Sequence, residues 1–546
     1  MQEYFVTEVL DPQPELVQQF LLQTSVLSRL TASLCDTVTE QQDSQAILVL
    51  LERANLFLEA LDTAGQWYRY HALFSEAMRS EARRRMGEDQ LRQLSSRASS
   101  WYERHGFHVE AIDAALHAQD YARAAILIEQ SLERQISLGK IHEYHTLYHW
   151  LEQFPETVLK RYPVLCLSYA TTLLLMSASW KPSQLTLREL ERLLRRAEQG
   201  FWAENNLLKL GELFAFRSLL AWRQDETQAA ALYAKQALAW LPQTQQIWHG
   251  ITLCAMGKEW IEAGHFQQAC AALLEAQARC ETAENPYFIR VTTILLARVF
   301  FEQGEFQQAF TLYRQALAEA RKDAHIEALC YALTGMAALS YEWNELEAAY
   351  QQAQEVIALS QLPGLEVHAV HATLILARIQ QARGHVTDAQ LQLAARLDTV
   401  PAVLLHLAEA IQTAQARIAL SVGDHMTLQR WATGRKPSHD FSQELEEELL
   451  LARWLRAQGK QEEASHQLER LLAATQNVGR TRRTLEIQVE MALVEASCNR
   501  KVEAQRLLRG ALAQAFDRNA MRLFLDAGEQ MAILLRSLLP QVHEQP

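Results

Sequence analysis

The most regular feature of the sequence is a pattern of turn-forming, aromatic and small residues that recurs every forty residues. Gly264-x-Phe266-x-x-Ala269 is followed by Gly304-x-Phe306-x-x-Ala309. The same step leads to Asn344 with Ala349, to Gly384 with Ala389 and, further on, from Gly459 with Ala464 to Asn499 with Ala504. One step back lies Gln224 with Ala229, and a region near Gly423 fits with a slightly shifted register. Repeats of this length are typical of helical repeat proteins.

A second set of positions keeps the same register. A small residue stands seven positions before each turn, and a large apolar residue stands eight before it. The small residues are Gly257, Ala297, Ala337, Ala377, Ala452 and Ala492. We interpret each unit as a helical hairpin in which the small residue lets the second helix approach closely. Gly or Asn then ends the first helix in the left-handed conformation, and the Ala five residues later lies on the inner face of the second helix.

Such hairpins leave apolar faces that only neighbouring hairpins can cover, so the array predicts a solenoid. The unit resembles the tetratricopeptide repeat (TPR), although that repeat has a shorter period of about 34 residues. We therefore expect an all-α fold in which a right-handed, TPR-like α-solenoid of about 40-residue hairpins follows an N-terminal module. A generic helical bundle is the alternative, and the strict spacing disfavours it.

The first ninety residues have a different pattern. Two amphipathic stretches, 15–27 and 44–54, precede the apolar and aromatic runs 56–61 and 65–70, which predict a β-hairpin around a turn at 62–65. A strongly helical segment, 71–86, follows. Short helices with a two-stranded wing indicate a winged-helix module. DNA binding by this module is disfavoured, because the helix before the wing offers Arg53 as its one basic residue and base and phosphate recognition needs more.

Two aromatic residues that are each followed by proline suggest where the repeat array begins. Phe154-Pro155 and Tyr162-Pro163 interrupt the helical pattern. We divide the chain into a winged-helix-like module at 1–90, a helical connecting segment at 91–160 and the repeat domain at 161–546.

Composition excludes several classes of protein. Apolar residues make up 49% and charged residues 21% of the 546 residues, which is typical of a folded domain rather than a disordered chain. The net charge of −13 makes bulk attraction to nucleic acid a poor expectation. No run of 18 apolar residues and no signal peptide is visible, so we expect no membrane contact. Seven cysteines without a C-x-x-C pair indicate reduced thiols in a cytoplasmic protein.

Several segments then resemble one family. Residues 4–10 with 20–27, the run Ala54–Leu58, and the run Trp67–Phe74 are similar to the segment that follows the ATPase module in MalT-like regulators. Those are bacterial signal-transduction ATPases with a terminal LuxR-type DNA-binding domain. Trp101-Tyr102, 161–165 and the closing run 524–528 also fit. The resemblance implies that the winged helix has an intramolecular role and that the repeats are a sensor for an inducer or an inhibitory protein.

Two parts of that family are not found in the sequence. A P-loop needs Gly-Lys followed by Ser or Thr, but the Gly-Lys pairs at 139, 257 and 459 are followed by Ile141, Glu259 and Gln461. No helix-turn-helix motif follows the repeats. We therefore expect either a truncated regulator or a stand-alone sensor, acting with an ATPase or DNA-binding partner or with domains missing here. No residue motif for a particular effector carries over from the family.

Aromatic residues give the most specific candidate for a ligand surface. Trp222, Tyr233, Trp240, Trp248 and Trp260 crowd two adjacent repeats, and aromatic faces stack on sugars and peptide side chains. The alternative is that they fill the core between long helices. The turn residues Gly264, Gly304, Asn344, Gly384, Gly459 and Asn499 are assigned a structural role.

Other candidate chemistry is weaker. His142, His145 and His149 share a helix face, but no Cys completes a zinc set, and His368 with His371 is only a pair. The run Arg79–Arg85 is interpreted as a solvated helix end. No catalytic constellation can be assembled, so we expect no enzyme, no cofactor and no metal.

The sequence thus predicts a non-catalytic sensor or regulatory module of a MalT-like transcriptional regulator. A small effector, a regulatory protein or both would bind the superhelix. The alternative is a stand-alone TPR-type scaffold for protein interactions. The effector, the partner and the direction of regulation are not encoded in any motif we can recognise.

Overall fold

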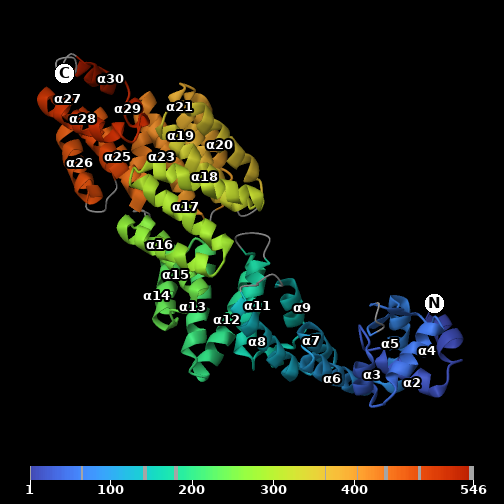
Figure 1. Ribbon diagram of the computed structural model, residues 1–546. Coiled ribbons are helices and arrows are strands. Elements are labelled where there is room, and N and C mark those ends of the chain that lie inside the picture. Colours follow the sequence, from blue (N-terminus) through green and yellow to red (C-terminus); the bar gives the residue numbers. More distant parts are fainter. Residues whose placement is uncertain are drawn as a thin grey trace. The chain divides into compact units, whose positions relative to one another are not determined.

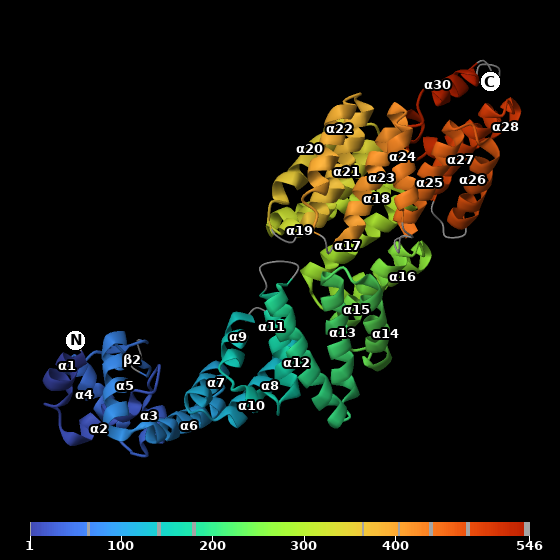
Figure 2. The same ribbon diagram turned by 180° about the vertical axis from the view of Figure 1, so that it is seen from behind.

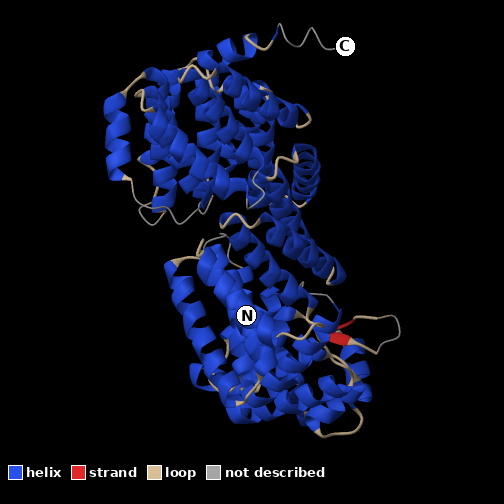
Figure 3. Cartoon of the chain, turned by 90° about the vertical axis from the view of Figure 1, so that its left-hand side faces the viewer, coloured by secondary structure: helices blue, strands red, loops and turns tan. Residues whose placement is uncertain are grey.

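The computed structural model describes residues 2–62, 66–138, 144–176, 182–362, 365–401, 404–435, 441–476 and 481–539. Helices make up most of these residues, and the sheet that accompanies them has two short strands (Figure 3). Within these ranges, no helix combines the length and the apolar character needed to cross a membrane. The predicted all-α class with a small N-terminal wing is confirmed.

The chain forms two compact units. The first comprises Met1–Met176 with Gln184–Asn206, and the second comprises Ser177–Ser183 with Leu207–Pro546. Each is described by itself below. The division of the chain at residues 90 and 160 stays a prediction.

The first unit opens with the winged-helix module. Its elements are α1 (Gln2–Tyr4), η1 (Phe5–Leu10, a π-helix), α2 (Glu15–Thr24), α3 (Ala32–Thr39), α4 (Ser44–Arg53), β1 (Leu58–Ala60), β2 (Tyr68–Tyr70) and α5 (Ala72–Met86). The strands are antiparallel with Leu58 opposite Tyr70, so the predicted hairpin is confirmed. Tyr68 also bridges to Leu30, and the Tyr70 hydroxyl lies 2.8 Å from that of Thr24. These contacts fix the wing to the helices before it.

Helical hairpins continue the first unit. They are built from α6 (Glu88–Arg104), α7 (His108–His117), α8 (Tyr121–Leu138), α9 (Tyr144–Glu152), α10 (Glu156–Leu159), α11 (Pro163–Leu175) and α12 (Gln184–Ala203). Small residues let these helices pack closely: Ala111, Ala115 and Ala124 are fully buried. Helices that follow each other in sequence cover several of the apolar faces, as α6 packs on α7, α7 on α8 and α11 on α12, whereas α9 packs on α11.

The second unit is a run of helical hairpins (Figure 1, Figure 2). Its helices are α13 (Leu207–Arg223), α14 (Thr227–Trp240), α15 (Gln246–Glu262), α16 (Phe266–Thr282), α17 (Pro286–Glu302), α18 (Phe306–Lys322), α19 (Ile326–Glu342), α20 (Leu346–Leu359), α21 (Glu366–Ala382), α22 (Val386–Leu397), α23 (Leu405–Val422), α24 (His425–Gly434), α25 (Phe441–Ala457), α26 (Gln461–Gln476), α27 (Thr481–Ser497), α28 (Lys501–Phe516), α29 (Arg522–Leu525) and α30 (Glu529–Arg536). Each odd-numbered helix from α13 to α27 pairs with the even-numbered helix that follows it.

The odd-numbered helices form an inner layer. Each contacts the next odd-numbered helix, from α13 with α15 through to α25 with α27, while the even-numbered helices pack on this layer from outside. The layer also curves back on itself, because α27 contacts α17 and α29 contacts α19. Stacking of hairpins into a curved array is the solenoid that the repeat predicts.

Burial follows the repeat columns. The small residues of the first helices, such as Ala297, Ala337 and Ala377, have no exposed surface. The same holds for the Ala column of the second helices, including Ala269 and Ala309. A larger side chain at these positions would push the paired helices apart. Close helix approach is therefore what the forty-residue spacing encodes.

The turns adopt the predicted left-handed conformation. Gly264, Gly304, Asn344, Gly384, Gly459 and Asn499 have φ angles of 82°, 78°, 63°, 83°, 77° and 63°. The turn predicted at Gln224, forty residues before Gly264, is wrong by one residue. Asp225, with φ of 62°, occupies the turn in place of Gln224, and Ala230 is buried in place of Ala229. At Gly423 the turn is retained (φ 75°), but Leu428 fills the position of the buried Ala.

Candidate functional site

The predicted aromatic residues are spread over three helices. Trp222 is buried in α13, whereas Tyr233 and Trp240 lie half-buried on α14. Phe214 of α13 joins the last two, with ring centroids 6.1 Å from Tyr233 and 5.4 Å from Trp240. This group packs between the two helices of one hairpin, so the structure brings Tyr233 and Trp240 together through a residue that the sequence analysis did not select.

Trp248 and Trp260 both lie half-buried on α15. Twelve residues separate them along the helix, which is a distance of about 18 Å at 1.5 Å per residue. They therefore cannot both contact one small ligand. Binding by any of the five aromatic residues stays a prediction.

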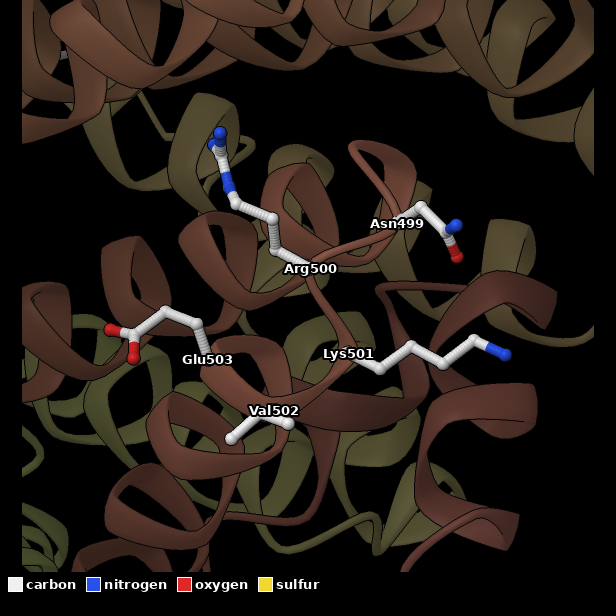
Figure 4. A pocket seen from close by; sticks show the side chains of 5 residues that line it. All are labelled: Asn499, Arg500, Lys501, Val502 and Glu503. Atoms are coloured by element: carbon white, nitrogen blue, oxygen red, sulfur yellow. The ribbon is translucent and has the colours of Figure 1, made fainter.

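The repeat turn at Asn499 borders a shallow, open surface depression, which Figure 4 shows with Arg500, Lys501, Val502 and Glu503. The side chains point in different directions and do not converge on one position. Arg500 instead binds the Glu495 carboxylate. The depression lacks the convergent polar groups that a specific ligand site requires.

A better candidate lies on the inner layer, where polar and aromatic side chains come from α13, α17, α19 and α21. We call it the inner polar cluster: Arg223, Tyr287, Glu327, Tyr331 and His368. The rings of Tyr331 and His368 meet edge to face with centroids 4.2 Å apart. Burial lowers the pKa of the Arg223 guanidinium, and the nearby Tyr287 and Glu327 oppose that change. These mutual effects place the groups within electrostatic reach of one another.

Glu327 has the most unusual carboxyl group of the cluster. Burial, reinforced by the charge of Asp225, raises its pKa to about 8 against the opposing charge of Arg223. Glu327 is therefore largely protonated at neutral pH and can both donate and accept a hydrogen bond. Perturbed carboxyl groups of this kind gather at functional sites.

Tyr331 reaches solvent, although its hydroxyl is largely surrounded by protein. The residue keeps 37% of its surface exposed, yet burial is the largest influence that raises the pKa of its hydroxyl. Burial also lowers the pKa of His368 to about 3, so that its imidazole is neutral. The cluster thus offers neutral donors and acceptors with aromatic faces, which suit a small polar ligand.

A second group on the inner layer is ionic. Glu446 of α25 lies between Arg378 of α21, Arg417 of α23 and Arg483 of α27, with N···O distances of 3.7, 3.2 and 2.7 Å. We call this group, extended below, the arginine network. Sequence analysis missed it, although a basic residue recurs six positions before the turns, as Lys258, Arg298, Arg378, Arg417 and Arg453.

Helix α29 and the segment before it dock on the C-terminal end of α19, which is far away in sequence. The Met521 backbone N–H donates to the Glu342 carbonyl at 3.0 Å. The Tyr341 hydroxyl donates to the Asp526 carboxylate at 2.9 Å, and the Arg522 guanidinium lies over the Tyr341 ring. Trp343 adds an indole N–H bond to the Arg518 carbonyl. These contacts close one turn of the superhelix.

The remaining predicted residues do not form a site. His142 lies outside the described residues, while His145 is exposed and the His149 imidazole lies 2.9 Å from Glu152. Among the residues with described positions, no group of three His, Cys, Asp or Glu side chains is arranged to hold a metal ion. Arg84 and Arg85 of the basic run bind Glu81 within their own helix.

Comparison with known proteins agrees with this architecture. The MalT winged helix domain matches residues 6–90, and the MalT-like TPR region matches residues 211–541. The HTH-type transcriptional regulator MalT of Klebsiella pneumoniae is 26% identical over 557 aligned residues, covering 99% of this chain and 59% of that protein. The regulator MalT of Cronobacter sakazakii gives the same values. The chain thus spans 59% of the length of these curated relatives.

Solved structures give more distant matches. A signal-transduction ATPase with a tetratricopeptide repeat sensor from Pyrococcus horikoshii is 12% identical, with a TM-score of 0.49 over 79% of this chain and 64% of that one. The apo quorum sensor NprR of B. thuringiensis is 14% identical, with a TM-score of 0.36 over 76% of this chain and 99% of that one. The family assignment rests instead on the two matched regions, which together cover most of the sequence. The chain belongs to the family of MalT-like regulators, of which it comprises the winged-helix and TPR portions.

Proposed function

We propose that this chain is the non-catalytic sensor portion of a MalT-like transcriptional regulator and that a small polar effector binds its inner polar cluster. The observation that carries the proposal is the convergence of Arg223, Glu327, Tyr331 and His368 from three inner helices. Neutral hydrogen-bonding groups beside aromatic faces are typical of sites that bind small polar ligands. The relatives named above are transcriptional regulators, which supports a regulatory role.

The curvature of the inner layer suggests how binding would be relayed. An effector that contacts α13, α19 and α21 together would favour one spacing of these helices. The altered spacing would pass along the stack to the rest of the regulator. By family resemblance, the receiving parts are an ATPase and a DNA-binding domain, and the setting is the bacterial cytoplasm.

Thermal unfolding tests the proposal. The whole chain is heated with a panel of neutral oligosaccharides, amino acids and nucleosides, because a ligand that binds the folded state raises the melting temperature. For each compound that does so, Tyr331→Ala and Glu327→Gln are expected to reduce the apparent affinity by about tenfold, the loss of a hydrogen bond or ring contact of about 1.4 kcal/mol.

Phe516→Ala is the matched control, because Phe516 is 86% exposed on the outer helix α28. This variant should bind as the unchanged protein does. Equal binding by all three variants would place the effector elsewhere. A chain that responds to no compound but retains a defined protein partner would support the scaffold alternative instead.

A further inference from the structure

We propose that the arginine network on the inner layer is a second ligand site, which takes a small organic anion bearing carboxylate or phosphate groups. It goes beyond the effector site proposed above, because it uses different residues on α21, α23, α25 and α27. Along α21, Arg378 lies ten residues from His368, which is about 15 Å at 1.5 Å per residue. The two sites can therefore be tested separately.

At the centre of the network, the carboxylate of Glu446 lies close to three guanidinium groups. Arg483 approaches Glu446 Oε2 at 2.7 Å, and Arg417 approaches Oε1 at 3.2 Å. Arg378 is 3.7 Å from the same Oε1, too far for a hydrogen bond. The guanidinium of Arg378 thus retains donor capacity that Glu446 does not use.

The surrounding pairs do not restore charge balance. Arg453 lies 2.9 Å from Glu486 and 2.7 Å from Glu490, and Arg456 lies 3.4 Å from Glu490. Arg483 also contacts Glu486 at 2.7 Å. Within this described set, five arginines thus share three glutamates. Counting Glu302 of α17, whose charge raises the pKa of Arg483, still leaves a positive surplus.

Two neighbouring ion pairs are balanced one to one. Arg482 lies 2.9 Å from Glu342, and Arg522 binds Asp526. They neither add to nor remove the surplus. Burial, followed by the charge of Arg378, lowers the pKa of Arg417. Burial also acts to lower the pKa of Arg378, but Glu446 and the other acidic neighbours outweigh it and raise that pKa. The charge that lacks full compensation therefore lies at Arg417. Desolvated charges of one sign are stabilised by a counter-ion.

The surplus is accessible to a solute. The side chains of Arg378 and Arg417 keep 24% and 17% of their surface exposed. Guanidinium groups bind carboxylates and phosphates through paired N–H donors. The Tyr341 ring lies 5.7 Å from the Arg378 guanidinium carbon and holds that group in place. Two partly exposed, oriented guanidinium groups fit an anion with two acidic groups.

The experiment compares citrate, inorganic phosphate and chloride at equal ionic strength, using calorimetric titration and thermal unfolding of the whole chain. Citrate is expected to bind with saturation and to raise the melting temperature, whereas chloride does neither. R378Q and R417Q should each weaken citrate binding by about tenfold, because each removes a charged donor. E446Q, which adds to the surplus, should strengthen it.

The control is R506Q, because Arg506 pairs with Glu503 on the exposed side of α28 and should not affect citrate binding. Y331A should also leave citrate binding intact, which separates this proposal from the effector proposal. No saturable binding by the unchanged chain would overturn the proposal and leave the network as a structural clamp. Equal binding by R378Q, R417Q and R506Q would overturn it as well. R378Q breaks no hydrogen bond to Glu446, so it remains informative if R417Q fails to fold.

Discussion

The close packing of neighbouring hairpins gives the sharpest prediction, at Gly335 of α19. A Cβ atom added there would lie 2.2 Å from Cζ of Tyr313 and within 2.5 Å of two further ring atoms. Tyr313 belongs to α18 and is only 5% exposed. Its ring is surrounded by the core between the hairpins α17–α18 and α19–α20, so it cannot rotate into solvent. Gly335→Ala should therefore force α18 and α19 apart.

Opposing terms set the magnitude. Overpacking a dense core by one methyl group costs about 1–3 kcal/mol. Replacing Gly by Ala in the middle of a helix contributes about 1 kcal/mol of stability. Because ordinary contacts to a Cβ atom lie at 3.4–4 Å, the ring has to move by more than an ångström, which places the overpacking cost at the upper end. We expect a net loss of about 2 kcal/mol.

Urea unfolding, followed by circular dichroism, measures this loss. Gly510→Ala is the matched control, because Gly510 is also helical but its added Cβ meets nothing within 4 Å. That variant should gain about 0.5–1 kcal/mol. In a Tyr313→Leu background, Gly335→Ala should become nearly neutral, because the ring that the added Cβ atom would meet is gone. Hydrogen exchange in α18 and α19 should rank the variants in the same order of stability as urea unfolding. If Gly335→Ala stabilised the chain as Gly510→Ala does, the packing argument would be refuted.

Three further predictions concern the turns, the inner polar cluster and the closure of the superhelix. Gly304→Ala and Gly384→Ala should both lose about 1–2 kcal/mol in urea unfolding because of their positive φ, but Gly304→Ala should lose more, because its Cβ would lie 3.1 Å from Arg518. The pKa of Glu327, raised from 4.5 to about 8, means that the folded chain holds a proton that the unfolded chain releases. The free energy of unfolding should therefore fall as pH rises from about 4.5 to 8, and Glu327→Gln should reduce this fall in pH-dependent unfolding. Tyr341→Phe, which removes the hydroxyl bound to the C-terminal segment, should cost about 1 kcal/mol and speed exchange of the Met521 amide hydrogen.

Local rules made the repeats predictable. A turn residue, a small residue before it and an Ala after it act within one hairpin, so their spacing is visible in sequence. The same logic identified the wing, because Leu58 and Tyr70 pair across a short turn. The misplaced turn at Gln224 shows the limit: a one-residue shift leaves similar residues in similar positions, and Asp225 adopts the left-handed conformation without Gly.

Contacts between distant repeats were not predictable in this way. Tyr341 and Asp526 meet across 185 positions, and no local rule encodes that distance. For a related reason, the sequence did not show how far apart Trp248 and Trp260 lie, since the rise of a helix separates residues that are near in number. The basic residues at 378, 417 and 453 stand at the same distance before their turns, which the sequence shows. Their role depends on the carboxylates that the curvature of the inner layer brings close to them.

Closure of the superhelix has a consequence for how the second unit unfolds. In an open repeat array each hairpin contacts only its neighbours, so unfolding can begin at an end and proceed unit by unit. Here α27 packs on α17 and α29 on α19, so the last hairpins are tied to the middle of the array. Fraying from the C-terminal end must break these contacts and the nearest-neighbour interface together. The hairpins between α17 and α29 should therefore unfold as one cooperative block, in which a change at any hairpin alters the stability of all the others.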